Sequence, residues 1–201
     1  MATIGSSAAL EPGQLTVAIG SPFQLQQTVT AGIVSSVNRP VPNVEGGVSA
    51  MIQTDAPINP GNSGGALANR NGELIGINAS IRTDGTGNSN VGIGFAIPID
   101  TAVEVAQRIV NGDSLDRGVL GVSSGGTQDL DVGVPISEVT AGSGADLGGI
   151  EVDDRILTID GVPVSNIGEL TGLVQSHFSG DVVELEILRG TDSITLEATL
   201  S

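Results

Sequence analysis

The stretch INPGNSGGAL, residues 58–67, places one serine, Ser63, among glycines in an otherwise apolar run. Acyl transfer needs a hydroxyl nucleophile and two backbone N–H donors aimed at the oxyanion, and glycine lets the backbone approach a substrate because it has no Cβ. The amides of Gly61 and of Ser63 itself could be these donors, with Asn62 between them. The pattern predicts a serine nucleophile with its oxyanion-hole loop. A glycine-rich turn with an incidental serine stays open as the alternative for GxSxG alone.

The remaining residue types exclude several other chemistries. The chain contains no Cys, and all seven of its basic residues are Arg, so it offers neither a thiolate nucleophile nor a lysine Schiff base. A single histidine, His177, cannot build a His-rich zinc site, and we expect neither a metal nor a cofactor. The net charge of -16 disfavours nucleic acid as a partner, because an acidic surface repels phosphate.

Acidic pairs are a further candidate for chemistry. Asp129 with Asp131, and Asp153 with Asp154, occur in turn-like sequence. Neither pair extends into the ligand spacing of a calcium loop. We therefore interpret them as solvated loop charges.

The first hundred residues predict an all-β domain. An α/β-hydrolase elbow would open a helix after its serine, whereas residues 66–81 predict a strand, a turn at Asn71-Gly72 and a second strand. A chymotrypsin-like β-barrel is therefore the better host for Ser63. Extended runs are expected at 15–19, 28–37, 48–53, 73–81 and 91–97, and residues 84–90 have the composition of a flexible loop.

From Pro98 onward the apolar period becomes helical. Thr101 with Glu104 fits a capping box, and Gly112 fits a C-terminal stop. The polar stretch 111–118 is the expected linker. After it, extended runs are expected at 118–123, 134–140 and 154–160, then a helix at about 166–178 and two closing strands around the turn at 189–192.

Several blocks resemble one protein family. TDAPINPGNSGGAL (54–67), NGELIGINASI (71–81) and VGIGFAIPID (91–100) closely resemble the C-terminal barrel of HtrA/Deg-type trypsin-like serine proteases, and residues 17–40 resemble the segment upstream of the serine. Residues 117–122, 141–164 and 179–190 resemble the PDZ domain that follows in this family. The resemblance implies a mostly β chain: the C-terminal barrel of a chymotrypsin-like protease domain over 1–112, without its N-terminal barrel, then an α+β PDZ domain over 117–201.

The resemblance also assigns site residues. Ser63 is the nucleophile, with Gly61 and Asn62 in the oxyanion-hole loop, and Asp55 is structural because it is not at the position of the triad acid. The pocket lacks an acidic group, which suggests a small or aliphatic residue before the scissile bond. The substrate-binding residues would be Asn59, Asn78, Ala79, Ser80, Ile93, Gly94 and Phe95. In PDZ domains a peptide C-terminus adds to a sheet edge and its carboxylate meets loop amides, here those of Gly118, Val119, Leu120 and Gly121.

One part of the family pattern is missing from this chain. The catalytic His and Asp of the family precede the serine, and no His precedes Ser63. His177 lies in the PDZ-like half, where we interpret it as an ordinary, partly exposed side chain. A serine without its base is a poor nucleophile, so we expect negligible proteolysis by this polypeptide alone, and an exposed barrel face where the missing half would pack.

Two hypotheses account for the missing base. In the first, the chain is part of a serine endopeptidase that degrades unfolded or damaged proteins, with a PDZ domain that recognises hydrophobic peptide C-termini. In the second, it is a non-catalytic PDZ-type peptide-binding protein with a vestigial barrel. We favour the first because the serine motif is intact. By resemblance we expect a homo-trimer or larger assembly outside the cytoplasm, in the periplasm or cell envelope, although the chain shows no signal or anchor.

Overall fold

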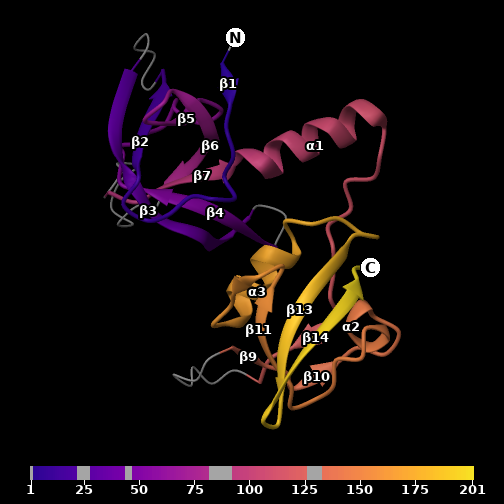
Figure 1. Cartoon of the computed structure of the whole chain (residues 1–201). Coiled ribbons are helices and arrows are strands. Elements are labelled where there is room, and N and C mark those ends of the chain that lie inside the picture. Colours follow the sequence, from indigo (N-terminus) through magenta and orange to yellow (C-terminus); the bar gives the residue numbers. More distant parts are fainter. Residues whose placement is uncertain (1, 22–27, 44–46, 82–91, 126–132) are drawn as a thin grey trace. The chain divides into compact units, whose positions relative to one another are not determined.

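The computed structural model describes residues 2–21, 28–43, 47–81, 92–125 and 133–201 (Figure 1). The chain forms two compact units: unit 1 comprises Met1–Arg39 and Ala50–Asn111, and unit 2 comprises Pro40–Ser49 and Gly112–Ser201. The expected loop at 84–90 and the pair Asp129 and Asp131 lie outside the described residues. None of the helices in the described ranges is long and apolar enough to span a membrane.

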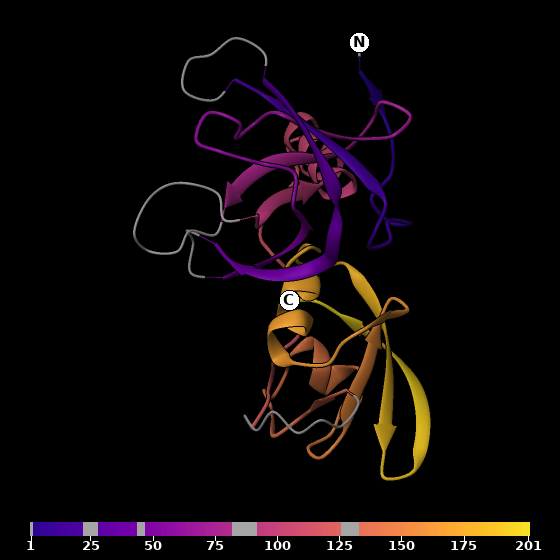
Figure 2. The same ribbon diagram turned by 90° about the vertical axis from the view of Figure 1, so that its left-hand side faces the viewer.

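Unit 1 contains a closed β-barrel. The strand order around it is β6 (Glu73–Ile81), β5 (Ala66–Asn69), β2 (Leu15–Gly20), β3 (Thr28–Pro42), β4 (Val48–Thr54) and β7 (Gly94–Pro98), and β7 pairs again with β6. A further strand, β1 (Thr3–Ile4), runs parallel to the start of β6. The curvature of these strands is clearest in Figure 2. Alternation along the strands sends aliphatic side chains inward. The buried core contains Ala18, Val34, Ile52, Ala56, Ile58, Leu67, Ile75 and Ala96.

The helix α1 (Ile99–Asn111) follows β7, and its start differs from the prediction. The capping box at Thr101 and Glu104 is wrong, because the helix already begins at Ile99. A main-chain donor in its first turn is paired with a residue that is distant in the sequence: the amide of Asp100 donates to the Ser7 hydroxyl over 3.2 Å. The predicted stop is confirmed, since Gly112 has φ +76°, a left-handed conformation that suits glycine.

The Asp100 carboxylate fastens the segment after β1 to the start of α1. Its Oδ2 accepts from the Ser7 amide and hydroxyl, each over 2.8 Å, and from the Ser6 hydroxyl and the Ala8 amide, each over 3.0 Å. Partial burial by itself would raise the pKa of Asp100, but these hydrogen bonds to the charged form outweigh it, Ser7 above all, and lower the pKa.

This cluster predicts a pH-dependent contribution to stability. A carboxyl whose pKa is lowered on folding stabilises the fold fully above its unfolded pKa, and that gain is lost as the pH falls through the folded value. We expect Asp100→Asn to reduce the free energy of unfolding by roughly 0.5–1 kcal/mol at neutral pH, since solvent screens an exposed group. The difference from wild type should be smaller at pH 2, because protonation of Asp100 removes the gain. Urea unfolding at both pH values measures it, with the exposed Asp113→Asn as control; an equal loss at both pH values would contradict the linkage.

Unit 2 is an α+β domain built on a twisted sheet. The sheet order is β12 (Val162–Pro163), β11 (Arg155–Ile159), β13 (Val182–Arg189) and β14 (Asp192–Thr199), and β9 (Val134–Pro135) also pairs with β11. A separate ladder joins β8 (Val122–Ser123) to β10 (Glu138–Val139). Figure 2 shows β13 and β14 as one long hairpin. The helices are α2 (Gly144–Leu147), which the sequence did not predict, and α3 (Ile167–Val174), which is shorter than expected.

Each unit has its own apolar core, and the predicted mostly β fold class is confirmed. Phe95 is 8% exposed within unit 1, and Phe178 is 1% exposed within unit 2. The Arg117 guanidinium lies 4.7 Å from the centre of the Phe178 ring, within the range of a cation–π contact. Aliphatic residues form nearly all of the remaining core.

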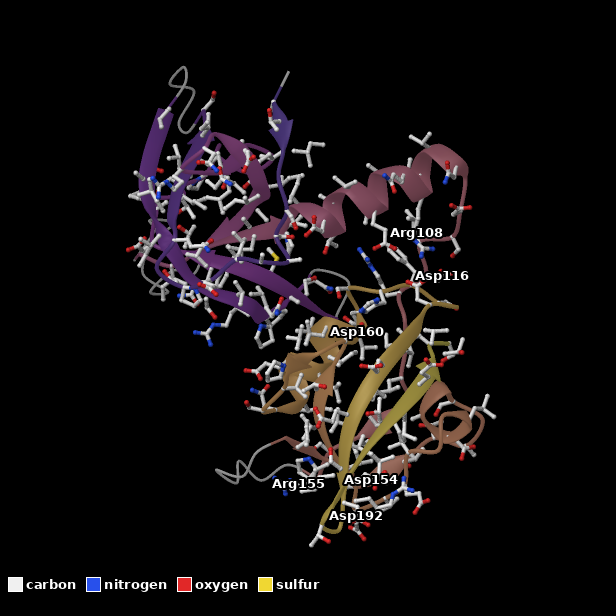
Figure 3. All side chains as sticks on the ribbon, viewed as in Figure 1. Arg108, Asp116, Asp154, Arg155, Asp160 and Asp192 are labelled. Atoms are coloured by element: carbon white, nitrogen blue, oxygen red, sulfur yellow. The ribbon has the colours of Figure 1, made fainter. Side chains whose placement is uncertain are left out.

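Asp154 contradicts the interpretation of the acidic pairs as solvated charges. Its side chain is 1% exposed, and both its oxygens accept from Arg189, with Nε–Oδ1 and Nη2–Oδ2 distances of 2.8 Å (Asp154 is labelled in Figure 3). The Glu151 amide donates to Oδ2 over 2.8 Å. Burial alone would raise the pKa of Asp154, but Arg189 and this amide outweigh it and lower the pKa. The neighbouring Asp153 is exposed, as expected.

Candidate active site and peptide groove

The segment that carries Ser63 joins β4 to β5, and its first arm is fastened to β3. The Asp55 carboxylate accepts from the Ile33 amide over 2.7 Å, and the Thr30 hydroxyl donates to the Pro57 carbonyl over 2.8 Å. Ile58 then enters the core with 1% of its surface exposed. Asp55 therefore has the structural role that was expected of it.

Two main-chain hydrogen bonds between residues close in sequence form the turn at the serine. The Asn62 amide donates to the Asn59 carbonyl, and the Gly65 amide donates to the Asn62 carbonyl, each over 2.9 Å. Gly61 has φ +102°, in the left-handed region that glycine adopts at low cost. The result is an exposed Ser63 at the tip of the turn, while Asn62 is 1% exposed and faces inward.

The amides of Gly61 and Ser63 are the two donors that the sequence assigned to an oxyanion hole. Among the residues that the structure describes, neither amide has a hydrogen-bond acceptor, and both residues are exposed. A substrate carbonyl oxygen within reach of the two amides could therefore accept from both, as acyl transfer requires. Their part in catalysis remains a prediction.

The Ser63 hydroxyl donates to the carbonyl of Ala79 over 2.9 Å. Ala79 is the extra residue of a β-bulge: Asn78 pairs with Ala96 and Ser80 pairs with Phe95, so Ala79 has no counterpart on β7. A bulge turns the main chain locally, and here it places a carbonyl beside the serine. No glycine or proline marks this position in the sequence.

The other predicted substrate-binding residues contribute in different ways. Asn59, Ala79 and Ile93 are partly exposed, whereas Asn78, Gly94 and Phe95 are buried. A Cβ on Gly94 would lie 2.9 Å from a carbon of Ile58, so the loop packs directly against β7. The main chain of Ser80 is placed by its pairing with Phe95. A role for these residues in substrate binding remains a prediction.

His177 has the ordinary environment that was expected. Its side chain is 31% exposed, and its Nε2 lies 3.2 Å from Oδ2 of Asp160, also in unit 2 (Asp160 is labelled in Figure 3). Its carbonyl accepts from the Gly118 amide over 3.1 Å. No group of three or more His, Asp or Glu in the described ranges could hold a metal ion.

Unit 2 contains a groove between the loop before β8 and the helix α3. The predicted loop residues Gly118, Val119, Leu120 and Gly121 all line it. Their amides are not equivalent, because the Gly118 amide donates to His177 and the Val119 amide donates to the Ser201 carbonyl over 2.9 Å. Within the described residues, the amides of Leu120 and Gly121 remain without an acceptor, and they are the better candidates to bind a carboxylate.

Sequence reasoning missed the opposite wall of the groove. α3 begins at its N-cap Asn166, whose Oδ1 accepts from the Glu169 amide over 3.0 Å. Its helical spacing could have indicated an apolar face toward the loop. None of the lining side chains carries a formal charge. The residues that had not been predicted are Val122, Ile167, Leu170, Thr171, Val174 and Gln175.

An exposed serine on a glycine turn of a closed β-barrel, followed by an α+β unit with an uncharged, largely apolar groove, is typical of a trypsin-like peptidase domain joined to a PDZ domain. The family description "Trypsin-like peptidase domain" matches residues 1–77, and "PDZ domain" matches residues 118–200. The solved structure of the HtrA-type protease AlgW with tripeptide is 36% identical with a TM-score of 0.67, over 100% of this chain and 68% of that one. The chain belongs to the HtrA family of serine proteases.

Curated relatives are similar in sequence to this chain along nearly its whole length. The periplasmic pH-dependent serine endoprotease DegQ of Escherichia coli K12 is 43% identical over 208 residues, which cover 98% of this chain and 45% of DegQ. The serine protease PepD of Mycobacterium tuberculosis H37Rv is 40% identical over 193 residues, which cover 91% of this chain and 41% of PepD. The chain thus spans less than half the length of these relatives.

Proposed function

We propose that this chain is the serine-bearing part of an HtrA-type endopeptidase that cleaves unfolded or damaged proteins. The observation that carries the proposal is the exposed Ser63 with the amides of Gly61 and Ser63 open beside it. In the acylation step Ser63 Oγ bonds to the substrate carbonyl carbon as a base takes the hydroxyl proton, and the carbonyl oxygen becomes an oxyanion that accepts from the two amides. The carbonyl then re-forms as the C–N bond breaks, and the base gives its proton to the leaving amine.

The proton from the Ser63 hydroxyl needs a base. No His precedes Ser63 in this chain, whereas DegQ and PepD are more than twice as long as this chain. We infer that the His and Asp of the triad come from a part of the whole protein outside this chain. The outward side of the ladder between β2 and β3 fits a surface that such a part would cover, since it exposes apolar residues. These are Leu15, Ile19, Val29 and Ile33.

The PDZ domain supplies the second function, capture of a peptide C-terminus in the groove beside α3. The apolar lining favours a hydrophobic last residue, and the Leu120 and Gly121 amides would bind its carboxylate. The domain bounds that fit this proposal are 1–112 and 117–201. The names of the relatives support a place outside the cytoplasm, in the periplasm or cell envelope. A homo-trimer or larger assembly of the whole protein is proposed by family resemblance alone.

Peptide binding to the 201-residue chain tests the PDZ function. A fluorescent peptide with a hydrophobic C-terminal residue should bind on the order of tenfold more weakly once its carboxylate is amidated. Gly121→Ala should abolish binding, because its Cβ would lie 2.2 Å from that of Ser143. Gly142→Ala is the matched control: its φ is +76°, against +86° at Gly121, but nothing lies near its Cβ. Failure to bind any member of a C-terminal peptide library would remove the claim.

A further inference from the structure

Asn78 is a fully buried amide beside the serine turn, with 0% of its surface exposed. The ladder between β2 and β5 extends as far as the pair Ala18 and Leu67. At the next position along both strands, the side-chain Nδ2 of Asn78 donates to the carbonyl of Ile19 over 3.2 Å and to that of Ala66 over 3.0 Å. One side chain from β6 thus bridges β2 and β5 where their own pairing ends.

The main chain of the same residue holds the turn itself. The Asn78 amide donates to the Gly65 carbonyl over 2.9 Å, and its carbonyl accepts from the Gly64 amide over 2.8 Å. Gly65 also packs tightly on β2, because a Cβ there would lie 2.1 Å from the Ile19 carbonyl oxygen. The residues that follow Ser63 are therefore fixed to β6 and β2 with little room to shift.

The side-chain amide of Asn78 is arranged for donation. Its Oδ1 is buried and has no hydrogen-bond partner among the described residues. An unpaired buried acceptor destabilises the fold, but the reversed orientation would place Oδ1 against the carbonyls of Ile19 and Ala66 instead. The two donated hydrogen bonds therefore decide which way this amide points.

We propose that Asn78 is a positioning residue for Ser63 rather than a residue that lines the substrate pocket. Its side chain sets the separation of Ile19 and Ala66 at the point where the turn enters β5. Its main chain then fixes the turn and, through it, the direction of the Ser63 hydroxyl and amide. The catalytic meaning of this role rests on the proposed function, but the positioning itself can be measured without hydrolysis.

Hydrogen exchange followed by NMR in the 201-residue chain measures the positioning. Asn78→Leu keeps a similar volume but removes both donors, so the Gly64 and Gly65 amides should exchange on the order of tenfold faster, beyond any change in global stability. Thr16→Val is the matched control: Thr16 is as buried in the same barrel, and its hydroxyl bonds to that of Thr54 over 2.9 Å. In Thr16→Val, exchange of the Gly64 and Gly65 amides should change only as much as the global stability changes.

A second variant covers the case in which Asn78→Leu does not fold. Asn78→Ser leaves space for a water donor and should give exchange rates between those of wild type and Asn78→Leu. The proposal would be overturned if, in a folded Asn78 variant, the Gly64 and Gly65 amides exchanged no faster than they do in Thr16→Val. These rates do not depend on whether Ser63 is a nucleophile, so failure of the proposed function would be distinguishable.

Kinetics in an active protein that also contains the base give a separate readout. A positioning role predicts that Asn78→Ser lowers kcat on the order of tenfold while KM stays within about twofold, since the lost interaction matters for the reacting groups. A rise in KM with kcat unchanged would assign Asn78 to substrate binding and would contradict the positioning role.

Discussion

Ser63→Ala is expected to lower peptide-bond hydrolysis on the order of a millionfold in a protein that combines this chain with its catalytic base. The reason is that the acyl-enzyme bond forms at Ser63 Oγ, and the open amides of Gly61 and Ser63 alone give only the small residual catalysis of an oxyanion hole. The measurement is cleavage of an unfolded protein substrate. Ser36→Ala is a matched control, because the Ser36 hydroxyl also donates to a main-chain carbonyl, that of Val37, over 3.2 Å.

One outcome would contradict the assignment of Ser63, and another would contradict the inference that the base lies outside this chain. Equal cleavage by wild type and Ser63→Ala would rule Ser63 out as the nucleophile. The 201-residue chain alone should be inactive with either residue. Hydrolysis by the wild-type chain that Ser63→Ala abolishes would show that the base lies within these residues.

Asp154→Ala is expected to destabilise unit 2 by about 2 kcal/mol, because the buried Asp154 carboxylate accepts hydrogen bonds from the Glu151 amide and from Arg189, whose own side chain is 34% exposed. The Glu151 amide and the Arg189 guanidinium both lose the carboxylate oxygens that they contact. Denaturant unfolding followed by far-ultraviolet circular dichroism measures the change.

A control within the same cluster separates the effect of the buried carboxylate, Asp154, from that of an exposed one. The Glu151 side chain is 67% exposed and meets Arg189 over 2.9 Å. Glu151→Ala should therefore cost less than about 1 kcal/mol. A loss from Glu151→Ala as large as that from Asp154→Ala would show that burial of Asp154 does not govern the stability of unit 2.

Strands with regular alternation could be predicted from the sequence, whereas features that depend on distant partners could not. The hairpin of β13 and β14 follows the apolar period closely, because it buries one face. β2 was predicted as a strand from the same kind of alternation, but its buried face carries Thr16 and Ala18, while Leu15 and Ile19 are exposed. The predicted start of α1 was wrong because the Asp100 amide in its first turn is hydrogen-bonded to Ser7, which lies 93 residues earlier in the sequence. β1 was missed since two residues paired with β6 carry no period at all.

In the candidate sites, too, local features could be predicted from the sequence and features that depend on distant partners could not. The glycines around Ser63 indicate the turn because the conformation there is local, and Gly61 adopts the positive φ that only glycine favours. The bulge at Ala79 and the bridging amide of Asn78 arise from pairing between strands, which a single sequence does not display. Asp154 was misjudged for a similar reason, since its partner Arg189 lies 35 residues away.

The sparse aromatic content of the two cores has a spectroscopic consequence. The chain has no Trp or Tyr, so it absorbs weakly in the near ultraviolet and lacks intrinsic tryptophan fluorescence. The described residues contain one phenylalanine in each unit, Phe95 and Phe178, both well buried. A tryptophan introduced at either position would report on its own unit against a silent background. Melting of the barrel and of the PDZ domain could then be followed separately in the intact chain.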